Sequence, residues 1–154
     1  MALIGRIVVI AFAIMVATFA AGVAISMGVL GPQWHAFSAD VGERAGFWVG
    51  VFFATSFTGA IGLLPAVILI ALAETFKVRS LLAYLATGVA LMVIGYYASG
   101  LAPPSYEESI DYPPPPISHA AEVAAAAGAV FGLTYWLLAG RNAGRWRESR
   151  QIAG

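Results

Sequence analysis

The sequence contains no cysteine and very few charged residues. Charged side chains make up 10% of the 154 residues and hydrophobic side chains 60%, whereas a soluble domain carries about 25% charged residues. The lack of cysteine excludes structural disulfides and thiolate metal sites. A soluble chain of this length could not bury so much apolar surface in one core, because small domains keep a large surface-to-volume ratio. We therefore expect an integral membrane protein.

Signatures of catalysis and of active transport are also missing. The sequence has no Gly-rich phosphate loop, no His-Glu-x-x-His zinc motif and no Ser, His and Asp set that can be assembled into a triad. Proton-coupled transporters usually carry an ionisable residue within the membrane, and no charged residue lies midway along an apolar run. A formal net charge of zero argues against a nucleic-acid partner. These absences predict a protein that is not an enzyme and needs no cofactor.

What the sequence does contain is long apolar runs. A helix needs about 20 apolar residues to cross the hydrocarbon, and its backbone groups must be bonded internally in lipid. The runs cover 7–30, 47–73, 81–102 and 119–140, with outer loops at 31–46 and 103–118 and a basic tail at 141–154. The first run exceeds the 7 to 15 apolar residues typical of a signal peptide, so we expect it to be retained. The prediction is an all-α, integral membrane four-helix bundle in one domain, residues 1–154.

Charge is strongly segregated between the two sides of these runs. One side holds Arg6, Lys77, Arg79, Arg141, Arg145, Arg147 and Arg150. The other holds mostly carboxylates, with Arg44 as its one cation. Positive residues in short flanking segments stay in the cytoplasm, which places both termini there, in a multi-pass protein of a bacterial inner membrane. The short turn between the second and third runs favours a surface pair of Glu74 with Lys77.

The ends of the runs suggest contacts with lipid. A juxtamembrane basic cluster gains about 1 kcal/mol per residue from anionic lipid, which assigns this contact to Arg141, Arg145, Arg147 and Arg150. Tyrosine and tryptophan gather at membrane interfaces. We therefore expect Tyr84, Tyr135 and Trp136 to form a belt on the inner side.

Small residues recur every four positions and predict close helix contacts. The positions are Ala20, Ala24 and Gly28 in the first run, Gly46 and Gly50 at the start of the second, and Gly128 and Gly132 in the fourth. We favour contacts within the bundle, and leave open contacts with another membrane subunit or a second copy. Pro65 removes a hydrogen bond inside the second helix, which predicts a kink.

The outer side carries both histidines. His119 and Glu122 are three residues apart, on one helical face, and with His35 they could ligate a metal ion. The two histidines could also hold a haem. The simpler interpretation is structural: Ser118 caps the fourth helix and Glu122 lies at the positive end of its dipole.

Three functions remain after these exclusions. The first is a non-catalytic structural, assembly or accessory subunit of a larger bacterial inner-membrane complex, such as a respiratory or photosynthetic one. The second is a small oligomeric channel or transporter whose path is lined by Thr55, Ser56 and Thr58. The third is a metal- or haem-bearing redox anchor. We expect membrane lipids and other integral membrane subunits, or further copies of the chain, as partners.

Overall fold

The computed structural model describes residues 2–30, 40–100 and 117–144. Its helices are α1 (Ala2–Leu30), α2 (Val41–Thr75), α3 (Leu81–Ala98) and α4 (His119–Leu138), followed by the short 3₁₀ turn η1 (Gly140–Asn142). All four α-helices are long and apolar enough to cross a membrane. The predicted all-α fold with four membrane-spanning helices is therefore confirmed across the described ranges.

Helix α2 begins earlier than the apolar run predicts. Asp40 is its N-cap: the Asp40 side chain accepts from the Glu43 amide at 2.7 Å, and the Glu43 carboxylate accepts from the Asp40 amide at 3.2 Å. This reciprocal capping box bonds two amides that would otherwise lack partners. Residues 41–46, which hydropathy assigned to the first outer loop, are therefore helical. Residues 31–39 of that loop, and most of the second loop, lie outside the described residues.

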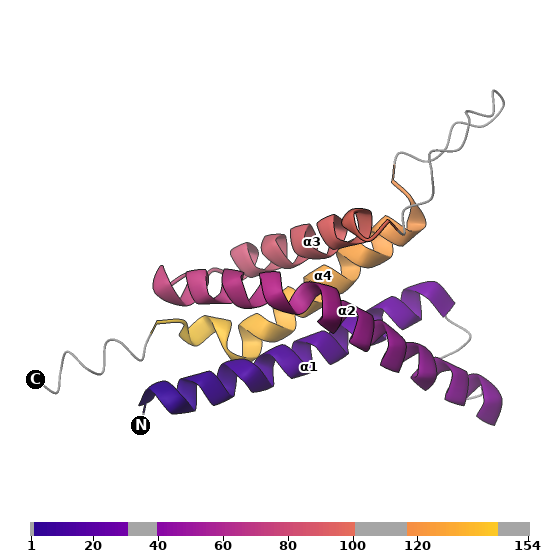
Figure 1. Cartoon of the computed structure of the whole chain (residues 1–154), viewed down its shortest axis with the longest axis horizontal. Helices are drawn as coiled ribbons and strands as arrows, with labels where there is room; N and C mark the ends of the chain where they lie inside the picture. The colour runs from indigo at the N-terminus through magenta and orange to yellow at the C-terminus, as the bar shows by residue number, and fades with distance from the viewer. Residues whose placement is uncertain (1, 31–39, 101–116, 145–154) are drawn as a thin grey trace, which may run out of the picture.

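The helices are arranged around α4. Helix α4 packs between α1 and α3, α1 packs against α2, and α2 touches α3 only slightly (Figure 1). The start of α1, the turn after α2 and the end of α4 meet at one end, here called the basic end. Among the described residues, its cations are Arg6, Lys77, Arg79 and Arg141. The starts of α2 and α4 lie at the opposite end.

Glycine lets α3 and α4 come into backbone contact. A Cβ atom on Gly128 would lie 2.8 Å from the Val89 Cα and would also overlap the backbone of Gly88. A Cβ on Gly132 would lie 2.9 Å from the Tyr84 carbonyl carbon. Real Cβ atoms do not approach other atoms so closely, so this contact leaves no room for a methyl group. Gly128 and Gly132 thus lie at a contact within the chain, and Gly88 is a third member that the spacing did not identify.

The buried row of α1 differs from the predicted one. Ala20 and Ala24 are half-buried, and the fully buried small residues are Ala13, Ala17 and Ala21. One residue corresponds to about 100° of helix rotation, and a helix so rich in alanine offers small residues at a spacing of four in several directions. Composition alone therefore does not select the face that packs.

The remaining predicted glycines differ in their surroundings. A Cβ on Gly28 would meet the Val123 side chain at 2.6 Å, whereas one on Gly50 would make ordinary contact with Leu30 at 3.4 Å. Gly46 is exposed on the first turns of α2. Gly28 therefore lies at a helix contact too close for a methyl group, and Gly50 does not.

Helix α2 is too long to cross a bilayer upright. Its 35 residues extend about 52 Å at 1.5 Å per residue, against about 30 Å of hydrocarbon. Pro65 lies inside the helix, and the ribbon changes direction near its middle (Figure 1). The part of α2 after Pro65 runs towards the basic end and packs on α1 through Ile70 and Glu74, but it leaves space beside α3.

Candidate functional site

A buried ion pair joins α1 to α2 at the basic end. The Arg6 Nε donates to the Glu74 Oε1 at 3.1 Å, and the Arg6 Nη2 also contacts this oxygen. Both side chains are only 10% exposed. Glu74, which the sequence predicted to pair with Lys77 at the surface, thus forms a buried long-range pair with Arg6, because Arg6 lies on the facing helix at the same depth.

Both side chains of this pair also bond to the backbone at and after the end of α4. The Arg6 Nη2 donates to the Ala139 carbonyl at 2.8 Å, and this carbonyl also accepts from the Asn142 amide at 3.1 Å. The Gly144 amide donates to the Glu74 Oε2 at 2.9 Å. We call Arg6, Glu74, Ala139 and Gly144 the Arg6 lock. It ties α1, α2 and the end of α4 together.

Gly144 suits this position for two reasons. Its φ of +75° lies in the left-handed region, where glycine has no steric penalty. A Cβ at this position would also lie 2.6 Å from the Lys77 Cγ. The chain can therefore turn back towards Glu74 only because residue 144 has no side chain.

The energetics of the Arg6 lock are those of a buried pair. Both charges give up water on burial, so the net contribution of the pair to stability is small. Removing one partner is a different matter, because the remaining charge is left buried without compensation, at about 3–5 kcal/mol. The main effect of the Arg6 lock is therefore to determine which helix ends meet. Its contribution to the total stability is small.

A pair of tyrosines continues the core beside the lock. The rings of Tyr84 and Tyr135 lie 5.7 Å apart. Tyr135 is 1% exposed and packs in one cluster with Ala13, Ile70 and Ala139. It is thus a core residue, and its assignment to a headgroup belt was wrong. Its hydroxyl has no hydrogen-bond partner among the described residues.

The other two belt residues lie nearer the surface and bond to the turn after α2. The Tyr84 hydroxyl donates to the Val78 carbonyl at 3.2 Å. The Trp136 indole donates to the Arg79 carbonyl at 2.9 Å. Both side chains thus hold the turn between α2 and α3 against the start of α3 and the end of α4.

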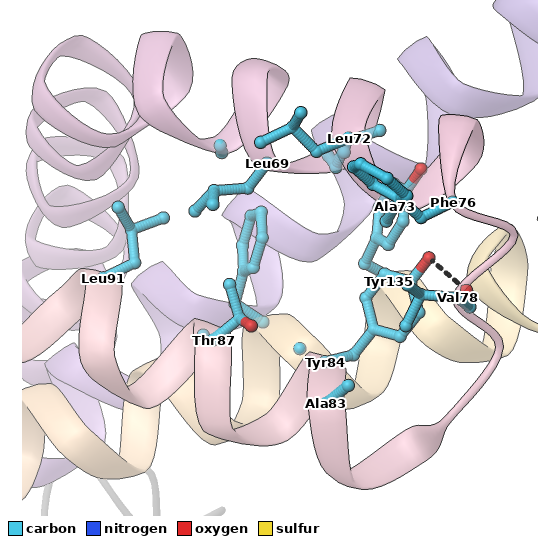
Figure 2. Close-up of a pocket in the computed structure, with 15 residues that line it drawn as sticks. Leu69, Leu72, Ala73, Phe76, Val78, Ala83, Tyr84, Thr87, Leu91 and Tyr135 are labelled. Carbon is cyan, nitrogen blue, oxygen red and sulfur yellow. Dashed lines mark hydrogen bonds between the residues drawn. The ribbon is translucent and has the colours of Figure 1, made fainter.

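A cavity of about 250 Å³ opens between α2 and α3 next to these tyrosines. Figure 2 shows Leu69, Leu72 and Phe76 along α2, facing residues of α3, with α4 beneath. The lining is almost entirely apolar, because Tyr84 uses its hydroxyl on Val78 and Thr87 is one of the few other polar side chains. Such a lining accommodates hydrocarbon rather than a polar substrate.

The predicted metal residues lie in an exposed setting at the opposite end. The His119 Nδ1 is 3.7 Å from the Glu122 Oε2, with side chains 78% and 64% exposed. The His119 Nε2 also lies 3.2 Å from the Gly28 carbonyl oxygen, which links the start of α4 to α1. Ser118 caps α4 by accepting from the Ala121 amide. No third His, Asp or Glu joins the pair among the described residues, and His35 lies outside them.

Two of the three hydroxyls of the predicted transport path, those of Thr55 and Thr58, lie at helix contacts. Thr55 lies directly against Gly22 of α1. A Cβ atom added to Gly22 would be 2.9 Å from the Thr55 backbone nitrogen. Thr58 is buried and Ser56 is exposed. A void of about 10 Å³ adjoins Thr58, at the lower limit for one water molecule. The described structure therefore brings Thr55 and Thr58 to the α1–α2 contact and not to a common passage.

The predicted lipid-contact arginines are only partly described. Arg141 is exposed on η1 at the basic end. Arg145, Arg147 and Arg150 lie outside the described residues. The described part of this cluster therefore faces the side on which a headgroup would lie.

The Arg6 lock is the part of the site that hydropathy and local spacing missed. Arg6 comes before the first apolar run and Glu74 directly follows the second, so the topology already places them at one end. Their common depth in the membrane was the signal that could have predicted the pair. The rotation that makes the two side chains face each other comes from packing of α1 on α2.

Neither a family model, nor a curated protein, nor a solved structure matches this chain.

Proposed function

We propose that this chain is a non-catalytic structural, assembly or accessory subunit of a larger bacterial inner-membrane complex, such as a respiratory or photosynthetic one. The observation that supports this most is the Arg6 lock, in which the buried charges bond to each other and to the end of α4. Groups satisfied in this way hold helices together and are not poised to bind or transform a substrate. A scaffold fixed at one end is what such a role requires.

The proposed orientation rests on the charges of the two ends. The basic end carries Arg6, Lys77, Arg79 and Arg141, whereas the opposite end carries Asp40, Glu43 and Glu122 beside Arg44. Positively charged flanks stay on the cytoplasmic side. Both termini are therefore cytoplasmic in this proposal, and the starts of α2 and α4 face the other side of the membrane.

The first half of α2 offers the surface on which a partner subunit would dock. Phe52 and Phe53 are 67% and 66% exposed, and Trp48 lies one turn before Phe52. Aromatic side chains are enriched at protein interfaces, where they bury large areas. The proposal therefore assigns the docking of a partner subunit to these side chains.

The channel alternative receives less support from the same helices. Its path needs the hydroxyls of Thr55, Ser56 and Thr58 on one water-filled surface, but Thr55 is pressed against Gly22 and Thr58 is buried. These positions are typical of hydroxyls that assist packing between membrane helices. We therefore place the accessory role first.

Purification of the tagged full chain from its native membranes in mild detergent tests the proposal. We expect one or more integral membrane proteins in fixed stoichiometry, in a particle larger than the chain alone. Replacing Phe52 and Phe53 by alanine should release these partners. The matched control replaces Phe12 and Met15, which are 58% and 70% exposed on α1, and should retain them. A monodisperse monomer from native membranes would overturn the accessory role.

A further inference from the structure

The short segment after α4 contacts the ends of all three other α-helices. Residues 139–144, here called the strap, follow the last residue of the fourth apolar helix and include η1. Four of the six residues are buried, and all four are alanine or glycine. A Cβ atom on Gly140 would lie 3.0 Å from the Tyr84 ring at the start of α3. The strap therefore packs closely on the basic end although it is not part of a membrane-spanning helix.

Three charged side chains from separate elements hold the strap. The Arg6 lock bonds both of its ends, through α1 and α2. Between them the Arg79 Nε, from the turn after α2, donates to the Ala143 carbonyl at 3.0 Å. Each of these bonds needs the strap in the same position, so they form and break together.

The strap has no large apolar side chain to anchor it. Its sequence is Ala-Gly-Arg-Asn-Ala-Gly, and two alanines bury little of the apolar area that chiefly holds a segment in a fold. Its regular structure is one 3₁₀ turn of three residues. Segments with few buried apolar contacts open locally at small cost, whereas core helices do not. The polar hold on the strap thus differs from the backbone packing that fixes α4 on α3 at Gly128 and Gly132.

We propose that the strap is a releasable clasp that opens as one unit while the four helices stay packed. Opening breaks the bonds from its three charged partners together. It also moves the point at which the basic tail leaves the bundle from Gly144 back to Leu138. Six residues of extended chain span about 20 Å at 3.3–3.6 Å per residue, so the open strap extends the reach of the tail by this length. The inference does not depend on whether the chain is an accessory subunit.

Amide hydrogen exchange of the full chain in detergent micelles, followed by NMR, tests whether the strap opens as one unit. The amides of Asn142, Ala143 and Gly144 are hydrogen-bonded. We expect one common protection factor for them, about tenfold lower than in the middle of α4. Arg79→Met removes the donor to Ala143 and should speed up exchange of all three amides about fivefold, without changing that of α4. Arg141→Met is the matched control: it removes an exposed cation of the strap and should leave the rates unchanged.

Two results of this experiment would overturn the proposal. Acceleration confined to one amide would show that the strap residues open separately. Protection of the strap equal to that of α4 would show that it belongs to the core and is not released.

A cysteine reporter gives a second measurement, since the chain contains no cysteine of its own. Ala143 and Ala13 are both 0% exposed, but Ala13 lies on α1 and becomes accessible only if the helices separate. Ala143→Cys should react with a water-soluble maleimide while Ala13→Cys does not, and Arg79→Met should raise the rate at Ala143→Cys about fivefold. An unreactive Ala143→Cys, or equal reaction at both positions, would contradict local release of the strap.

Discussion

The two ends of the bundle each carry an acid–base pair, and the two pairs differ in almost every physical respect. Arg6 and Glu74 come from different helices, are 10% exposed and bond further to Ala139 and Gly144. His119 and Glu122 share the first turn of α4 and are 78% and 64% exposed. The exposed pair follows from local spacing and contributes little. The buried pair links distant parts of the chain, and its partners depend on each other.

The largest expected effect comes from removing one member of the buried pair. Glu74→Gln leaves the Arg6 charge buried without a counter-charge and should lower the free energy of unfolding by about 3–5 kcal/mol. Unfolding in mixed detergent micelles, followed by circular dichroism, measures this change. Glu122→Gln is the matched control at the opposite end.

The double variant Arg6→Met with Glu74→Leu completes this test. Replacing both partners of a buried pair by apolar side chains is often neutral or stabilising, so the double variant should recover most of the stability that Glu74→Gln loses. Equal losses in the single and double variants would show that the pair is not coupled as described.

Glycine substitutions compare a closed helix contact with an open one. Gly132→Ala places a methyl group against the backbone of Tyr84 and should destabilise the bundle by about 1–3 kcal/mol, the usual range for overpacking. Gly62 has nothing within 4 Å of its Cβ position. Gly62→Ala should therefore be neutral, or gain up to about 1 kcal/mol from helix propensity. Thermal unfolding of both variants in one detergent measures whether the two stability changes differ in sign. A loss of stability in Gly62→Ala as large as that in Gly132→Ala would contradict this prediction.

The cap of α2 should have a smaller and more local effect. Asp40→Ala removes the acceptor for the Glu43 amide and should cost about 1 kcal/mol, as N-cap losses usually do. Faster hydrogen exchange confined to residues 41–46 is the expected signature. Exchange that is unchanged there would mean that contacts other than the cap hold the start of α2.

The sequence predicted those features of the fold that depend on hydropathy along the chain. Apolar length predicted the four helices, because each must cross the same thickness of hydrocarbon. It misplaced the start of α2, because hydropathy marks the apolar run and not the cap at Asp40. The Asp-x-x-Glu spacing of 40–43 was present as a capping signal and would have corrected this boundary.

What the sequence could not provide is the rotation of each helix. Glu74 faces Arg6 and Tyr135 enters the core because of how α1, α2 and α4 turn about their axes. Helices that are apolar on every side give no periodic signal for that rotation. The cavity between α2 and α3 is unpredictable for the same reason, since it depends on where α2 runs after Pro65.

The smallest expected effect is at His119, and it decides whether burial is the property that separates the two ends. His119→Ala removes the contact with Glu122 and the contact with the Gly28 carbonyl. Because water can replace both partners at an exposed site, the free energy of unfolding should change by no more than about 0.5 kcal/mol. The same detergent titration as for Glu74→Gln gives a direct ratio of the two effects. A loss at His119 as large as that at Glu74 would mean that the link between α1 and α4, and not the burial of charge, governs how the bundle is held.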